Sequence, residues 1–294
     1  MAETAAPKPA PTARLGHAIA LILLANLLFA FVDTSTKWLS GAGVAVLQLA
    51  FMRYATHLAI TGLDMGRMPW TRLSLPTHGL IALRAFFLIS ATVVNFYALQ
   101  HLSLSVTSAI LYLAPVITCL LGWALLGERI GAGHAAAIVL GFGGVLMIVR
   151  PFGEEVNLYA LLMLYPATAM SLYAILTRKL AGTVRPGLMQ FYTGVFGTAV
   201  LAPVGIWFWE NPSTGLDWLL LFAIGAFAWA GHEAMTRAHI YAEASTLMPF
   251  GYSFVIYLSL AGWIVFGNVP DAATVIGALI ISAAGLIIWR LRSV

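Results

Sequence analysis

The residues best able to do chemistry in this sequence are the few ionisable side chains inside long apolar stretches. Only 9% of the 294 residues are Asp, Glu, Lys or Arg. Arg53 has His57 one helical turn after it, and His232 and Glu233 are adjacent, with Arg237 one turn later. A charge at the centre of a membrane helix costs about 2.5–3.5 kcal/mol to insert, so each of these groups needs a partner or a role.

Two interpretations stay open for each group. Arg53 either contacts a substrate or, as we prefer, holds helices together through backbone carbonyls. Glu233 either forms a local i, i+4 ion pair with Arg237, or it forms a substrate or proton site with His232, whose imidazole titrates near neutral pH. Trp229 lies one turn before Glu233 on the same helix face.

Uncharged polar residues supply further candidates. Asn26 and Phe29 share a helix face with Asp33, and Asn95 lies in another apolar stretch. An asparagine amide accepts from an ammonium and donates to a carboxylate. Asn26 and Asn95 are therefore candidate substrate ligands, with interhelical hydrogen bonding as the alternative, and Asp33 is a structural or coupling candidate.

Aromatic residues in the middle of apolar stretches could line a binding cavity. Tyr112, Tyr165, Trp229 and Tyr252 are the candidates, because aromatic rings stack on flat apolar groups and tyrosine also offers a hydroxyl. Ordinary helix packing is the alternative for each of them.

The motifs of several function classes are absent from the sequence. It contains no Gly-x4-Gly-Lys-Ser/Thr, no His-Glu-x-x-His and no Gly-x-Ser-x-Gly, so we predict neither ATP hydrolysis nor an intramembrane enzyme, and no catalytic residue, metal or cofactor. The net charge of +4 is spread along the chain, which argues against nucleic-acid binding. No soluble output domain supports a sensor or scaffold.

The elements that must position these residues are membrane helices. The chain is 61% hydrophobic and only 9% charged, whereas a soluble domain has roughly 25% charged residues. Because a spanning helix needs about 20 apolar residues, the sequence predicts an all-α membrane protein after a disordered tail over 1–14. Its ten spans are expected at 16–36, 43–62, 78–98, 104–126, 132–150, 156–177, 187–209, 217–236, 244–266 and 272–290.

The basic residues set the expected orientation. With a cytoplasmic N-terminus, eleven Lys and Arg residues fall on the inner side, Lys37 and Arg150 fall on the outer side, and Arg53 and Arg84 fall within spans. By the positive-inside rule, both termini are predicted to be cytoplasmic.

An internal repeat organises the chain. Residues 104–150 align without gaps on 244–290 at an offset of 140, with ten identities in 47 positions, among them Tyr112 with Tyr252 and a shared Gly-Trp-x-x-x-Gly. Five crossings separate the copies, so the second half (151–294) is predicted to be inverted relative to the first (15–150). Inverted repeats place a site at a pseudo-two-fold axis near the membrane midplane, where Tyr112 and Tyr252 should face each other.

These features resemble the drug/metabolite transporter superfamily, in its EamA-type ten-helix branch. The likeness covers nearly the whole chain and rests on ten spans, two five-helix halves, and a fourth span that contains Pro115 and ends in Gly127-Glu128. The second half has Asn268 at the position of Glu128, and Glu128, like Arg53 and Arg237, is a structural or coupling candidate. The resemblance also matches Arg53 and implies that it lies outside the central helices.

Within the superfamily, the chain is most similar to YddG-type bacterial amino-acid exporters. The resemblance implies inner-membrane export or exchange of aromatic and other neutral amino acids by alternating access. The alternative is a carrier of another metabolite or a drug. The expected partners are a small-molecule substrate and the lipid bilayer; proton coupling and the choice between monomer and homodimer stay open.

Overall fold

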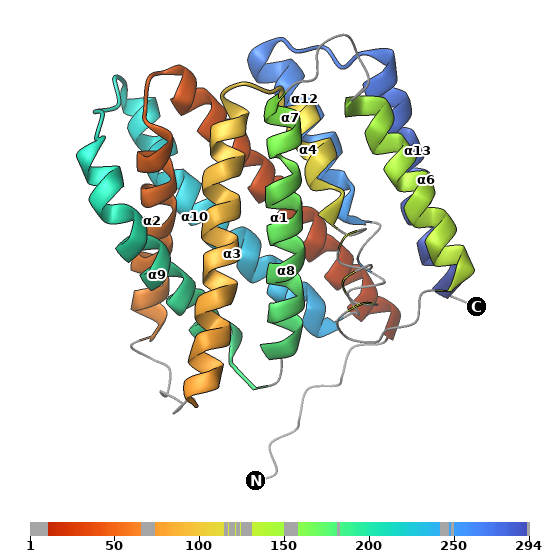
Figure 1. Ribbon diagram of the computed structural model, residues 1–294, viewed down its shortest axis with the longest axis horizontal. Helices are drawn as coiled ribbons and strands as arrows, with labels where there is room; N and C mark the ends of the chain where they lie inside the picture. The colour runs from red at the N-terminus through yellow and green to blue at the C-terminus, as the bar shows by residue number, and fades with distance from the viewer. Residues whose placement is uncertain are drawn as a thin grey trace.

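The computed structural model describes residues 11–65, 74–114, 131–149, 158–180, 183–241 and 250–292, together with Ile117, Leu121, Ala124 and Leu247. These residues form α-helices and no strand, so the all-helical prediction is confirmed (Figure 1). The first half contains α1 (Pro11–Gly41), α2 (Val46–Met65), α3 (Leu75–Leu99), α4 (Leu104–Leu111) and α6 (Ala132–Val149). The second half contains α7 (Leu158–Leu162), α8 (Leu164–Leu180), α9 (Pro186–Trp207), α10 (Gly215–Tyr241), α12 (Ser253–Phe266) and α13 (Ala272–Arg292).

The length and composition of the helices are those of a multi-pass membrane protein. Within the described residues, five segments are long and apolar enough to cross a membrane: Leu15–Gly41, Leu75–Leu99, Leu158–Thr177, Pro186–Trp207 and Gly215–Ala238. Three shorter apolar segments lie in α6, α12 and α13.

Two of the predicted spans are interrupted where the sequence contains proline. The span expected at 104–126 has its first helix end at Leu111, four residues before Pro115. The span expected at 156–177 breaks between α7, which ends at Leu162, and α8, and Pro166 again follows four residues later. Proline has no N–H to donate to the carbonyl four residues earlier. The carbonyls of Leu111 and Leu162 therefore lose their usual helical donor.

The helix pairs that join the two halves form a pattern that is unchanged when the halves are exchanged. The contact of α1 with α10 corresponds to that of α8 with α3, and the contact of α1 with α12 corresponds to that of α8 with α4. The pairs α2–α9, α4–α12 and α6–α13 each join equivalent helices. In Figure 1, α3 and α8 lie in front of α1 and α10, while α6 and α13 pair at the right edge. This exchange symmetry is the one expected of two repeats related by a pseudo-two-fold axis.

Glycines let α2 lie close to α9 and α10. A Cβ added at Gly197 of α9 would lie 2.4 Å from Cγ of Tyr54, and one added at Gly225 of α10 would lie 2.7 Å from the carbonyl oxygen of Arg53. Small residues permit such close backbone approach in membrane bundles. This packing on both sides places Arg53 inside the bundle.

Polar side chains in the first span of each half bond carbonyl groups in the fourth span of the other half. In α1, the Asn26 amide donates to the carbonyls of Phe250 (3.1 Å) and Gly251 (3.2 Å). In α8, the Ser171 hydroxyl donates to the carbonyl of Ala114 (2.8 Å). In both cases the first span of one half bonds the fourth span of the other, which ties the two halves together.

Candidate functional site

A cavity of about 220 Å³ lies where the two halves meet, and we refer to it as the central cavity. Helices α1, α2, α3, α4, α8, α10 and α12 or the residues next to them contribute to it. The lining residues are Asn26, Phe29, Val32, Asp33, Arg53, Leu88, Ala91, Thr92, Asn95, Phe96, Leu111, Tyr112, Ala114, Pro166, Met170, His232, Met235 and Phe254. Six of the twelve residues singled out from the sequence for binding, structural or coupling roles are among them.

One wall of the central cavity carries a carboxyl group paired with an amide. Asp33 of α1 is 6% exposed, and its Oδ1 accepts a hydrogen bond from the Asn95 amide of α3 at 3.2 Å. The Oδ1 of Asn95 is buried and has no partner within the described residues. A carboxylate and an amide oxygen therefore stand together on this wall as hydrogen-bond acceptors.

Arg53 brings a buried positive charge to the same cavity. Its Nη1 donates to the hydroxyls of Tyr54 (3.2 Å) and Thr92, and its guanidinium lies over the rings of Tyr54 (5.2 Å) and Phe96 (5.9 Å). The hydrogen-bond partners of Arg53 are side chains rather than the backbone carbonyls that we preferred from the sequence, so Arg53 joins α2 to α3 and also lines the cavity.

His232 of α10 lines the cavity and is almost fully buried, at 3% exposure. Its ring meets Phe29 edge to face at 4.9 Å between centroids, and Tyr173 lies 6.2 Å away. Neither ring nitrogen has a hydrogen-bond partner in the described part of the chain. The imidazole is thus held by aromatic packing, and its polar atoms are not used by the protein.

The repeat-related tyrosines meet as predicted. The rings of Tyr112 and Tyr252 lie 5.0 Å apart at 37°, and Phe254 lies 6.1 Å from Tyr112. Tyr112 lines the cavity, while Tyr252 is buried and packs against Tyr112. The pair therefore joins α4 and α12 at the interface between the halves, with one member next to the cavity.

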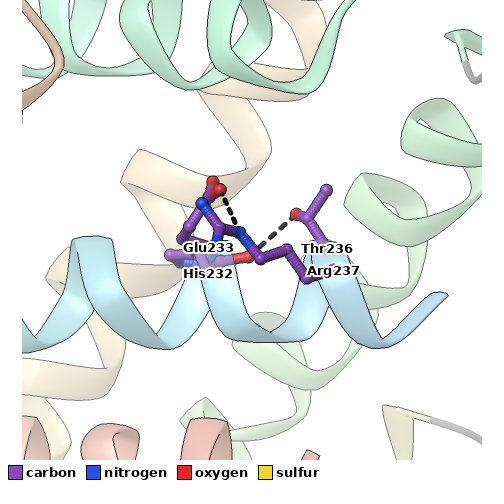
Figure 2. Close-up of polar contacts among 4 residues, drawn as sticks. All are labelled: His232, Glu233, Thr236 and Arg237. Carbon is purple, nitrogen blue, oxygen red and sulfur yellow. Dashed lines mark hydrogen bonds and ion pairs between the residues drawn. The ribbon is translucent and has the colours of Figure 1, made fainter. Parts of the chain in front are cut away.

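Glu233 and Arg237 form the local ion pair that one interpretation predicted. Arg237 Nε donates to Glu233 Oε1 at 2.8 Å, and the Thr236 hydroxyl donates to the carbonyl of His232 (Figure 2). The side chains of Arg237 and Glu233 are 63% and 29% exposed, and neither residue lines the cavity. This surface position arises because Glu233 follows His232 directly, so it projects about 100° around the helix from it.

The remaining predicted residues lie elsewhere. Tyr165 is 40% exposed, and its hydroxyl bonds Ser90 at 2.8 Å. Trp229 is half-buried and is not part of the cavity lining. Glu128 lies outside the described residues. Among the residues that the structure describes, no three His, Cys, Asp or Glu side chains gather in a way that could hold a metal ion.

Sequence reasoning gave no role to a second buried arginine, Arg84. It is 3% exposed and donates to the hydroxyls of Thr177 (2.8 Å), Thr193 (3.0 Å) and Tyr173 (2.6 Å). No acidic side chain pairs with it in the described residues. The three hydroxyls come from α8 and α9, so Arg84 joins both helices to α3. Its position in an apolar span was the available signal, but its partners lie about 90 or more positions away in sequence.

The apolar part of the cavity lining also escaped prediction. Phe96, Met170 and Phe254 look like any other apolar residue of a membrane helix in the sequence. Only the three-dimensional packing distinguishes a ring that faces a cavity from one that faces lipid.

Three characterised relatives align with this chain. A riboflavin transporter from Vibrio cholerae is 27% identical over 277 residues, covering 92% of this chain and 93% of its own length. A pseudopaline exporter from Pseudomonas aeruginosa is 27% identical over 282 residues, covering 95% and 98%. An S-adenosylmethionine uptake transporter from Rickettsia prowazekii is 25% identical over 192 residues, covering 65% of each chain.

Structural comparison and a family match complete the assignment. One solved crystal structure superposes with a TM-score of 0.71 at 19% identity, covering 95% of this chain and 99% of its own, which shows a shared fold. The EamA-like transporter family matches residues 16–150 and again residues 157–290. These two matches take in most of the chain, each covering one of its halves. The protein therefore belongs to the EamA-like transporter family and is a transporter rather than an enzyme.

Proposed function

We propose that the protein is a secondary transporter of a small metabolite in a bacterial inner membrane, with both termini cytoplasmic. The observation that carries this proposal is the central cavity, where opposite charges and aromatic rings line a space between the two halves. The two halves would rock against each other and expose the cavity to each side in turn.

The size and lining of the central cavity favour a compact solute. Its volume of about 220 Å³ lies below the roughly 300–1,000 Å³ typical of drug-sized ligands.

The names of the three relatives cover riboflavin, pseudopaline and S-adenosylmethionine. These names favour a carrier of metabolites beyond free amino acids over a dedicated aromatic amino-acid exporter.

A cavity-filling variant tests this function. The full-length protein in proteoliposomes should exchange at least one labelled solute from a panel of amino acids, riboflavin and S-adenosylmethionine without ATP. Ala91 is 3% exposed and lines the cavity, so Ala91→Trp should lower the exchange at least tenfold by occupying the space. Val139 of α6 is 70% exposed, so Val139→Trp is the matched control. Equal exchange by Ala91→Trp and Val139→Trp would contradict the assignment of the cavity.

A further inference from the structure

Two opposite charges line the central cavity from different helices. Asp33 lies on α1 and Arg53 on α2, and both are more than nine-tenths buried. No hydrogen bond or salt bridge joins them within the described residues. A buried charge without a direct counter-ion is expensive in a membrane bundle. The two charges are therefore separated beside a space that a solute could fill.

Each charge keeps hydrogen-bonding capacity that the protein does not use. Asp33 accepts from Asn95 through Oδ1, and its Oδ2 has no partner in the described part of the chain. Arg53 donates through Nη1 to Tyr54 and Thr92, while Nη2 has no partner there and Nε is buried without one. An unsatisfied buried polar group costs about 1–3 kcal/mol, and more if it is charged. A ligand that supplied the missing partners would recover part of this cost.

The arrangement fits a ligand with two charges better than one with a single charge. A simple anion would satisfy Arg53 and be repelled by Asp33, and a simple cation would do the reverse. A neutral solute would leave both charges without a counter-ion. An ammonium offers three donors for Asp33 and Asn95, and a carboxylate accepts from a guanidinium through two parallel hydrogen bonds.

We infer that the central cavity binds a zwitterionic group, with its ammonium at Asp33 and Asn95 and its carboxylate at Arg53. The rings of Phe29, Phe96 and Phe254 line the rest of the space and would contact the apolar remainder of the solute. This inference rests on the proposed transport function and narrows its substrate class. Free amino acids and larger metabolites that carry an amino-acid group both belong to that class.

Matched analogues of one solute test the charge requirement. Equilibrium binding of glycine, L-leucine, L-phenylalanine and S-adenosylmethionine is measured on the purified full-length protein. For the tightest-binding amino acid, its decarboxylated amine and its deaminated acid are compared; for L-phenylalanine these are phenethylamine and 3-phenylpropionate. We expect the zwitterion to bind at least tenfold more tightly than either analogue. Binding of none of the zwitterions, or equal binding of the three matched compounds, overturns the inference.

Single substitutions assign the two ends of the ligand. The Asp33→Asn protein should bind the zwitterion no more tightly than the deaminated acid. The Arg53→Gln protein should bind the zwitterion no more tightly than the amine. Glu233→Gln and Arg237→Gln are the matched controls, because they neutralise an acid and a base on α10 outside the cavity. They should keep the wild-type preferences. If Arg53→Gln does not fold, Arg53→Lys keeps the charge and should keep the preference for the zwitterion.

The outcomes separate this inference from the transport function. If riboflavin exchanges in proteoliposomes but no zwitterion binds, transport stands and the zwitterion site is wrong. If Asp33→Asn keeps its preference over the deaminated acid, the ammonium does not lie at Asp33 and the inference fails. If no solute of the panel exchanges or binds, both the inference and the transport proposal fail.

Discussion

The contact between α2 and α10 gives a sharp test of how the cavity is built. A Cβ placed on Gly225 would lie 2.5 Å from Cβ of Thr56, 2.7 Å from the carbonyl oxygen of Arg53 and 3.1 Å from that of Met52. All three atoms are fixed to the α2 backbone, so no side-chain rotation can relieve the overlap. Gly225→Ala must therefore push the two helices apart.

The size of the effect follows from the contact distances. Carbon–oxygen contacts in helix interfaces lie at about 3.3–3.6 Å, so the helices must separate by roughly 0.6 Å or more at Arg53. Overpacking of this kind costs about 1–3 kcal/mol, which is about 5- to 150-fold in an equilibrium constant. Gly62 of α2 has no atom within 4 Å of its added Cβ, so Gly62→Ala should stabilise the protein by about 0.4–1 kcal/mol.

The assay compares the two glycine variants with the wild type. The apparent melting midpoint in detergent is followed by tryptophan fluorescence, and exchange is measured in proteoliposomes. We expect Gly225→Ala to melt earliest and Gly62→Ala at or above the wild type. Exchange by Gly225→Ala should also fall, because the shift moves the backbone of Arg53. If the Gly225→Ala protein has the same melting midpoint as the Gly62→Ala protein and exchanges solute at the wild-type rate, the packing argument is refuted.

Three further substitutions separate buried from exposed polar groups. Arg84→Met should destabilise the protein by about 1–3 kcal/mol, because three buried hydroxyl oxygens lose their donor; the expected readout is a lower yield of monodisperse protein, and a normal yield would contradict the role. Asn26→Ala should lower the free energy of unfolding by about 1–3 kcal/mol, since two carbonyls lose a donor. The readout is a lower melting midpoint, and an unchanged midpoint would contradict this. Tyr165→Phe should leave exchange unchanged, because the residue is exposed outside the cavity, and impaired exchange would return it to the site.

Long apolar segments were predictable because membrane helices must satisfy their backbone internally. The breaks after Leu111 and Leu162 were less accessible. Proline marked both places, but proline is also tolerated within membrane helices, as Pro203 is inside α9. The sequence therefore indicated where a helix could break and left open whether it did.

The sequence indicated which types of polar residue form the site, but it located only some of them correctly. Asn26, Asp33 and Asn95 were found because deep polar groups are rare in membrane helices, and they line the cavity. The place of Arg53 beside the cavity was not predicted, because it depends on the packing of α2 against α3, where Thr92 accepts its hydrogen bond, and no local pattern encodes that packing. Glu233 was found, but its neighbour His232 is the residue that lines the cavity.

The most direct test of the central claim is substrate protection of a thiol inside the central cavity. The single native cysteine, Cys119, is replaced by serine, and Ala91→Cys places a thiol in the lining. In proteoliposomes, a membrane-impermeant thiol reagent is added to either side with or without the exchanged solute. The account predicts modification from both sides, slowed by the saturating solute. A modification rate that the solute does not change, or labelling from one side alone, would contradict a central site reached by alternating access.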